Sequence, residues 1–199
     1  MKILVIGATG TIGKAVVSEL SARHEILQAG RSSAPHRADI TSEASLRELF
    51  GAVGPLDAIV CTAGHVHFGP LATMTVDQFK IGLNDKLLGQ VQLAWIGTEH
   101  LTDGGSITLT TGILARDPIK LGANATTVNA AVEGFVRAAA IELPRGIRIN
   151  AVSATVVIES LADYGPYFRG FEAVPVQRVA TAYAKSVEGA QTGQVYCIS

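Results

Sequence analysis

Short runs of consecutive apolar residues alternate along this chain with longer segments whose apolar residues recur every three or four positions. The first run spans residues 3–6 and ends at a glycine. A continuous apolar run of this length is typical of a strand that is buried on both faces, as in a parallel sheet. The pattern predicts strands at residues 3–6, 25–30, 57–62, 106–111, 147–152 and 194–198.

Helices are predicted between the strands, because apolar residues recur there at the spacing of one helix face. One link differs. Only seven residues separate Arg31 from Asp39, and Pro35 is among them, so a crossover helix does not fit. The alternation predicts an α/β fold in three layers, with helices on both faces of a parallel sheet and a single domain over residues 1–199. The predicted helices cover residues 11–23, 76–100, 125–143 and 176–188, with another that begins after Thr41 or Ser42.

Three evenly spaced glycines follow the first strand, in the sequence GATGTIG. Glycine lets the backbone turn sharply and approach a ligand, and the helix N-terminus that follows offers free N–H groups to an anion. This order of strand, glycine loop and helix is typical of a Rossmann-like, doubly wound domain that binds a dinucleotide. A tight turn without a ligand is the alternative, which we favour less. The predicted phosphate contacts are Gly7, Thr9, Gly10, Thr11, Ile12 and Gly13.

The end of the second predicted strand favours NADP(H) over NAD(H). An acidic residue at this position would bond the ribose 2′-hydroxyl of NAD(H) and repel a 2′-phosphate, and the chain has none there. The guanidinium of Arg31 can pair with a phosphate, and Ser32 can donate a hydrogen bond to it. The alternative is that Arg31 is an ordinary solvated side chain.

Composition narrows the possible functions. The 199 residues are 48% hydrophobic with a formal net charge of −1, so no basic surface for nucleic acid is indicated. The longest apolar runs are too short to cross a membrane. The two cysteines, Cys61 and Cys197, lie in apolar strand-like runs, which predicts reduced core thiols of a cytoplasmic protein rather than a disulfide. No cluster with metal-ligand spacing is evident, so no metal is predicted.

Nearly the whole chain resembles the short-chain dehydrogenase/reductase family. The loop GATGTIG resembles the phosphate loop of that family, and Asn84 in GLNDKLLG resembles its active-site helix asparagine. Residues 129–154 resemble the helix and strand that carry and follow its Tyr-x-x-x-Lys motif. The second crossover helix of the family is missing here. Further resemblance is carried by Asp39-Ile40-Thr41, by Cys61-Thr62-Ala63-Gly64 and by residues 186–196.

The resemblance implies hydride transfer between a nicotinamide cofactor and a carbonyl or alcohol carbon of a small molecule. In the family a tyrosine donates the proton, a lysine four residues later assists it, and a serine orients the carbonyl. Here the tyrosine position is Ala125, the lysine position is Asn129, and the serine position is Thr111 or Gly112. The resemblance therefore leaves Asn84 and Thr111 as the predicted catalytic residues. The further cofactor contacts that it implies are Asp39, Ile40, Cys61, Thr62, Ala63, Gly64, Asn129 and Val157.

Several other side chains are alternatives for the missing proton donor, because a general acid needs only to reach the substrate oxygen. We interpret the tyrosines among them as packing or substrate-contact groups, the histidines as a loop pair without a metal, and the lysines as solvated. The irregular segment 156–173, which contains the tyrosines, could close over a substrate. These alternatives are Tyr164, Tyr167, His65, His67, Lys86 and Lys120.

The favoured hypothesis is an NADP(H)-dependent oxidoreductase with an atypical acid/base site. An NADP(H)-binding protein that has lost catalysis and reports redox state to a partner is the alternative. A fold without any cofactor is disfavoured because the glycine loop is intact. Family members usually form dimers or tetramers through two long helices, and segments 76–100 and 125–143 have the apolar and small residues for such an interface. We therefore expect a homodimer or homotetramer.

Overall fold

A parallel sheet of seven strands runs through the computed structural model, which describes all of residues 1–199. The strand order is β3-β2-β1-β4-β5-β6-β7, and every neighbouring pair is parallel. The order reverses direction between β1 and β4, which confirms the predicted doubly wound α/β fold and marks where such folds bind ligands. The strands are β1 (Lys2–Ile6), β2 (Glu25–Gly30), β3 (His36–Arg37), β4 (Leu56–Cys61), β5 (Leu101–Thr110), β6 (Arg148–Ala154) and β7 (Val195–Ile198).

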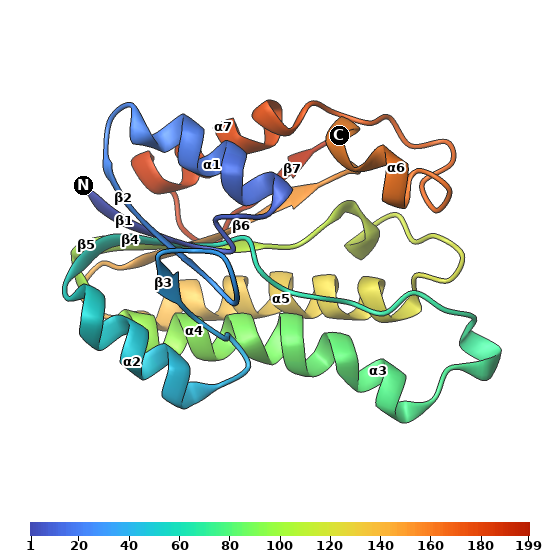
Figure 1. Ribbon diagram of the computed structural model, residues 1–199, viewed down its shortest axis with the longest axis horizontal. Helices are drawn as coiled ribbons and strands as arrows, with labels where there is room; N and C mark the ends of the chain where they lie inside the picture. The colour runs from blue at the N-terminus through green and yellow to red at the C-terminus, as the bar shows by residue number, and fades with distance from the viewer.

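Helices cover both faces of the sheet, giving the three predicted layers (Figure 1). α1 and α7 lie on one face, whereas α2, α4 and α5 lie on the other. No helix is both long and apolar enough to cross a bilayer. The helices are α1 (Thr11–Ser21), α2 (Glu43–Val53), α3 (Val76–Gly82), α4 (Gly89–Thr98), α5 (Ala123–Glu142), α6 (Leu161–Tyr164) and α7 (Val176–Glu188), with short 3₁₀ turns at Leu71–Thr73, Ile113–Ala115 and Ile158–Ser160.

The absence of a crossover helix in the short stretch after β2 is confirmed, because no helix lies between β2 and β3. After β2 the chain passes through a short loop into β3, which pairs beside it through Ala29 and Gly30. α2 then follows, with Ser42 as its N-cap: the Ser42 hydroxyl accepts the backbone N–H of Ser45 at 3.3 Å. This cap satisfies one of the free N–H groups of the first turn.

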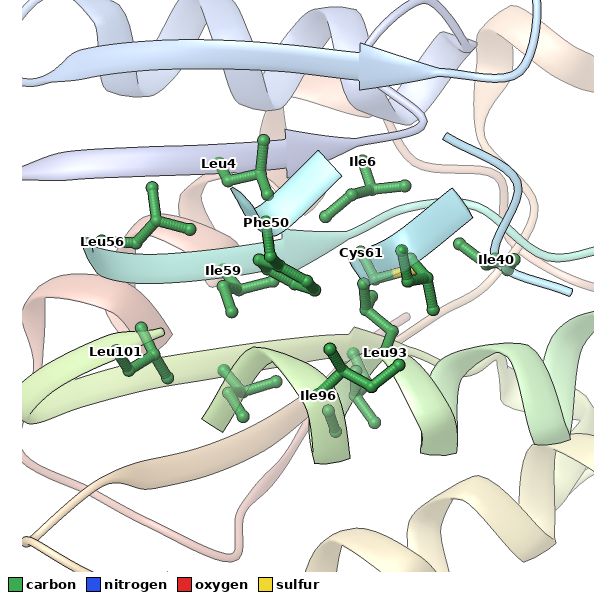
Figure 2. Packing of buried hydrophobic residues seen from close by; sticks show 14 of the residues in the cluster. Leu4, Ile6, Ile40, Phe50, Leu56, Ile59, Cys61, Leu93, Ile96 and Leu101 are labelled. Atoms are coloured by element: carbon green, nitrogen blue, oxygen red, sulfur yellow. The ribbon is translucent and has the colours of Figure 1, made fainter. Parts of the chain in front are cut away.

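One hydrophobic core cluster packs α2 and α4 onto the sheet (Figure 2). Phe50 of α2 is fully buried and points toward Ile59 of β4, and Leu93 of α4 reaches the same cluster. α4 approaches closely at Gly97, because a Cβ there would lie 2.5 Å from the Ile59 Cδ1. The buried area of such large side chains is the main stabilising contribution to this layer.

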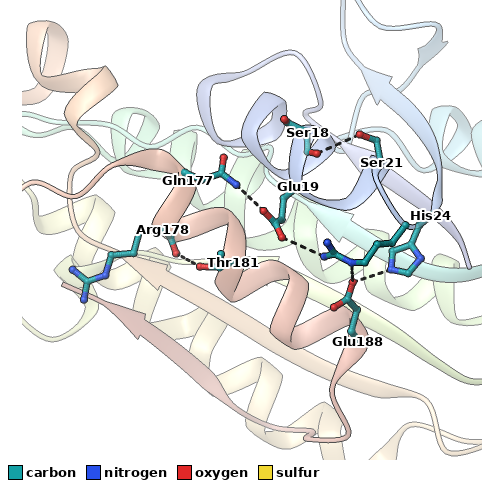
Figure 3. A network of polar contacts seen from close by, with 9 residues as sticks. Ser18, Glu19, Ser21, His24, Gln177, Arg178, Thr181 and Glu188 are labelled. Carbon is teal, nitrogen blue, oxygen red and sulfur yellow. Dashed lines mark hydrogen bonds and ion pairs between the residues drawn. The ribbon is translucent and has the colours of Figure 1, made fainter.

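Polar side chains join the two helices on the other face (Figure 3). The carboxylate oxygen Oε1 of Glu188, in α7, accepts hydrogen bonds from Arg23 Nε and His24 Nε2, each at 2.9 Å. Gln177 Nε2 donates to Glu19 Oε2 at 2.7 Å. Exposed pairs of this kind contribute at most about 1 kcal/mol each to the free energy of unfolding. They therefore fix the position of α1 relative to α7 but add little to the stability of the fold.

Two sequence predictions need correction. The helix expected at 76–100 is one helical run, but its middle, Leu83–Leu88, is a π-helix between α3 and α4. A π-helix has wider turns, so side chains after it point to a different face from the one that an α-helix predicts. Cys61 is buried as expected, whereas Cys197 is exposed, because it lies on the edge strand β7. Both thiols are free.

Candidate functional site

The glycine loop forms a closely packed cradle between β1 and α1. Gly7 has a φ of +82°, and a Cβ there would lie 2.8 Å from the backbone nitrogen of Ala63. A Cβ on Gly13 would lie 2.0 Å from the carbonyl oxygen of Gly7. Gly10 is the N-cap of α1, and no side chain caps that terminus or places a carboxylate in its first turn. The helix end therefore remains open to an anion, as a pyrophosphate requires.

A groove of about 510 Å³ lies over this cradle at the carboxyl ends of β1, β2 and β4. Its position matches the adenosine and phosphate half of a dinucleotide site. The structure brings most of the predicted cofactor residues to this groove. They are Gly7, Thr9, Gly10, Arg31, Ser32, Ile40, Thr62, Ala63 and Gly64.

Four predicted cofactor residues do not line a cavity. Thr11 is exposed at the start of α1, and Gly13 packs against the Gly7 carbonyl. Asp39 accepts the backbone N–H and the hydroxyl of Thr41, which hold the pKa of the Asp39 carboxyl below its ordinary value. The Cys61 side chain points into the hydrophobic core, and burial raises the pKa of its thiol to about 12.

Arg31 spans the groove and pairs with a carboxylate that sequence reasoning missed. Its Nη2 lies 3.1 Å from Asp85 Oδ2 and 3.7 Å from Asp39 Oδ1. Asp85 Oδ1 also accepts the backbone N–H of His65 at 2.8 Å. The groove thus contains an acidic group after all, supplied by the π-helix rather than by the end of β2. Only the fold reveals it, since 54 residues separate it from Arg31.

A second cavity, of about 460 Å³, continues from the groove and shares Thr62, Gly64 and His65 with it. The structure brings Thr111, Gly112, Ala125 and Asn129 together in its wall. Ile12 and Val157 complete the predicted residues that line it. The two cavities adjoin at these shared residues along the carboxyl end of the sheet, and we refer to them together as the channel.

Two residues that line this second cavity have unpartnered polar atoms. Asn129 Oδ1 and Thr155 Oγ1 are buried and have no hydrogen-bond partner, although both residues line the cavity. Buried polar groups in proteins are almost always paired, so such atoms indicate a bound polar group. Thr155 directly follows β6 and was not predicted. A nicotinamide ribose or carboxamide has hydroxyl and amide donors for these acceptors.

The Thr111 hydroxyl lies in the cavity wall but donates to Glu133 Oε1 at 3.1 Å. Glu133 is buried on α5 and is held from the far side by Arg137, whose Nη2 lies 3.3 Å from Glu133 Oε2. In this geometry the Thr111 proton is engaged by Glu133, so the hydroxyl oxygen has only its lone pairs available to a ligand in the cavity. It can therefore orient a donor, but it is not free to donate to a carbonyl oxygen.

The placement of Asn84 with Thr111 in one site is wrong. Asn84 is exposed and lines a separate surface groove with Lys80 and Gln92. The residue of this helix that lines the second cavity is Lys86, which we had interpreted as solvated. The π-helical turn explains both errors, because it alters which residues face inward. Lys120, by contrast, is exposed as predicted.

Lys86 sits close against the cofactor channel. A Cβ on Gly64 would lie 2.7 Å from Lys86 Cγ. The aliphatic part of the lysine side chain therefore packs directly against Gly64, in the loop that follows β4. Burial lowers the pKa of the Lys86 ammonium to about 8. A lysine with a pKa near physiological pH is suited to exchange protons.

The irregular segment after β6 covers the mouth of the second cavity. Tyr164 and Phe168 line the cavity, as does Phe68 from the loop after β4. The Phe68 ring lies 6.2 Å from the Tyr164 ring and 5.1 Å from the Tyr167 ring, between centroids. This contact between two distant loops gives the cavity an aromatic cover. His65 and His67 also line it, and no group of three or more potential metal ligands occurs in the chain.

Comparison with known proteins agrees with this geometry. The family model described as enoyl-(acyl carrier protein) reductase matches residues 10–196. A hydroxynaphthalene reductase of Aspergillus fumigatus is 30% identical over 65% of this chain, and the match spans half of that relative's length. A hydroxynaphthalene reductase-like protein of Metarhizium brunneum is 30% identical over 80% of this chain and 69% of its own.

Solved structures of two further proteins are also similar to this chain. The protein lin1944 of Listeria innocua is 47% identical, with a TM-score of 0.98 and full coverage of both chains. A small-chain dehydrogenase in complex with NADPH is 27% identical, with a TM-score of 0.89, covering all of this chain and 96% of its own. The family match over nearly all residues shows that this chain belongs to the short-chain dehydrogenase/reductase family, and the fold agrees with this assignment.

Proposed function

We propose that residues 1–199 form a single cytoplasmic NADP(H)-binding domain that reduces or oxidises a small carbonyl or alcohol compound. The observation that carries this proposal is the channel of two adjoining cavities, which has the phosphate cradle and Arg31 at one end and an aromatic cover at the other. A bound reduced nicotinamide would supply a hydride to the carbonyl carbon of the substrate. The aromatic lining favours an apolar or aromatic substrate, which buries its surface against Phe68, Tyr164 and Phe168.

The preference for NADP(H) over NAD(H) rests on Arg31. Its guanidinium is 63% exposed at the rim of the groove and can turn from Asp85 to a 2′-phosphate. A phosphate with two negative charges is a stronger partner for a guanidinium than a single exposed carboxylate is. The NADPH complex of the related small-chain dehydrogenase is consistent with this preference.

An NADP(H)-binding protein without catalysis is the second candidate. It is supported by Ala125 and Asn129, which stand in the cavity wall where the family has its tyrosine and lysine. Alanine has no proton to give, and the asparagine amide carries no charge that could lower the pKa of a neighbour. The binding residues are the same in both candidates, so only turnover separates them.

Turnover is tested by following NADPH absorbance with 9,10-phenanthrenequinone and with 4-nitrobenzaldehyde as probe carbonyls. We expect substrate-dependent oxidation of NADPH with at least one of these probes. Tight NADPH binding without oxidation by either probe would favour the redox-sensing candidate instead. The Arg31→Ala variant is the matched control, because oxidation in the channel has to weaken when the cofactor binds less well.

We also propose a homodimer or homotetramer, with a second copy of the chain seated on α4 and α5. Large apolar side chains are exposed on these helices: Trp95 is 72% exposed and Ile141 is 87% exposed. The charged substitution Trp95→Glu should shift the protein toward the monomer, because it would bury a carboxylate in an apolar contact. Light scattering after gel filtration measures this shift, with Leu71→Glu, at an exposed residue outside α4 and α5, as the control. A monomeric wild-type chain would contradict the proposal.

A further inference from the structure

The cavity under the aromatic cover contains one lysine and no carboxylate. Lys86 is the single lysine among its lining residues, and Asp, Glu and Arg are absent from them. The lysine enters from the π-helix between α3 and α4, and this π-helix packs against α5, the helix that carries Asn129. A charged side chain in a partly apolar cavity is expected to bind a ligand or take part in catalysis, because its desolvation is unfavourable without a partner.

No ion pair accounts for Lys86. Burial is the main cause of its low pKa, and the one titratable neighbour that acts on it is the thiol of Cys61, which burial keeps protonated and therefore uncharged. The adjacent carboxylate, Asp85, is engaged by Arg31 and by the backbone N–H of His65. The ammonium is therefore available to a ligand in the cavity rather than committed to the protein.

We propose that Lys86 is the proton donor to the substrate oxygen in this cavity. The inference rests on the proposed oxidoreductase function and names the acid that the family's tyrosine position, Ala125, does not supply. As the carbonyl carbon gains a hydride from the reduced nicotinamide, which is thereby oxidised, the C=O π pair moves to the oxygen. That oxygen forms an O–H bond as an N–H bond of Lys86 breaks. The neutral amine then regains its proton from water.

The location of Lys86 makes this transfer chemically reasonable. It shares the cavity wall with Thr111 and Asn129, whose oxygen atoms can orient a ligand, and it packs on Gly64 where the two cavities meet. The remaining titratable groups around this space are Cys61, His65, His67, Tyr164 and Asp85. Because the protonated ammonium is the donor, the rate of reduction should be maximal below pH 8 and should decrease as the pH rises through that value.

The first experiment observes Lys86 without any turnover. Lysines of the whole protein are dimethylated with ¹³C-formaldehyde, and the methyl signal of Lys86 is assigned by its absence in Lys86→Arg. We expect this signal to titrate near pH 8 and to change when NADP⁺ is added. Lys80, which is exposed on the neighbouring α3, is the internal reference. A Lys86 signal that titrates with the bulk of the lysines and ignores NADP⁺ would overturn the inference.

The second experiment measures turnover of 9,10-phenanthrenequinone and 4-nitrobenzaldehyde with NADPH. Lys86→Met should lower kcat by about 10²–10⁴-fold, the usual contribution of a positioned general acid. Lys86→Arg should be nearly as slow, because arginine keeps the charge but does not release its proton at neutral pH. NADPH binding should remain, and methylamine should partly restore Lys86→Ala. Lys80→Met is the matched control and should retain wild-type kcat.

The outcomes separate the two proposals. An active wild-type protein whose Lys86→Met variant keeps its kcat and its pH profile would overturn the role of Lys86 and leave the proposed function standing. A wild-type protein that binds NADPH but oxidises it with neither probe would overturn the proposed function and, with it, this role. A full kcat in Lys86→Arg would show that charge alone is needed and would also overturn proton donation.

Discussion

Gly13→Ala should abolish measurable binding of NADP⁺ and lower the stability of the fold. The added Cβ would lie 2.0 Å from the Gly7 carbonyl oxygen, which is backbone and cannot rotate away. The loop and the start of α1 must separate, and the N–H groups that face the pyrophosphate then lose their arrangement. We expect a loss of about 3 kcal/mol in the free energy of unfolding, at the upper end for overpacked positions.

Thermal unfolding and nucleotide titration measure the two effects of Gly13→Ala separately. Gly51→Ala is the control, since Gly51 is exposed within α2 and a Cβ there meets nothing within 4 Å. That variant should be more stable by roughly 0.5–1 kcal/mol, because alanine loses less backbone entropy in a helix. A Gly13→Ala protein that binds NADP⁺ like the wild type would show that the glycine loop does not hold the cofactor.

Arg31→Ala should weaken NADPH binding and leave NADH binding nearly unchanged. Removing a charge-assisted hydrogen bond to the 2′-phosphate costs about 1.5–3 kcal/mol, which corresponds to roughly 10–100-fold in Kd. NADH has no such phosphate, so it loses only a surface contact. Fluorescence titration of both nucleotides measures the difference.

Asp85 provides the matched variant for Arg31. Asp85→Asn keeps an oxygen for the His65 N–H but removes the charge that competes for Arg31. NADPH should bind up to about fivefold more tightly, in keeping with the small value of an exposed ion pair. Arg47→Ala, on the exposed face of α2, is the control for loss of a surface arginine. Equal weakening of NADPH and NADH by Arg31→Ala would contradict the assignment of the 2′-phosphate.

The features that could be predicted from the sequence are those that local chemistry determines. The buried strands follow from short apolar runs, and the cradle follows from the need for glycine at Gly7 and at the close approach of Gly13. The absent crossover helix follows from chain length, because too few residues separate Arg31 from Asp39. Each of these inferences depends on residues near one another in the sequence.

The features that could not be predicted depend on tertiary contacts. The π-helix is invisible to an α-helical periodicity, so Asn84 was expected in the site where Lys86 lies. Asp85 meets Arg31 only because the fold brings the helix to the end of β2. Cys197 has apolar neighbours in the sequence but is exposed on the edge strand β7. Which strand forms the edge depends on the order of all seven strands, which the local sequence does not contain. In each case the side chain's direction, rather than its residue type, determines its role.

We propose that the channel of this short-chain dehydrogenase/reductase holds NADP(H). Titration of the wild-type protein with NADPH and with NADH, followed by the fluorescence of the reduced nicotinamide, is the first test of this proposal. We expect saturable binding of both nucleotides, with NADPH tighter by at least about tenfold, the lower end for a charge-assisted hydrogen bond. NADH binding as tight as or tighter than NADPH, or no binding of either nucleotide, would contradict it.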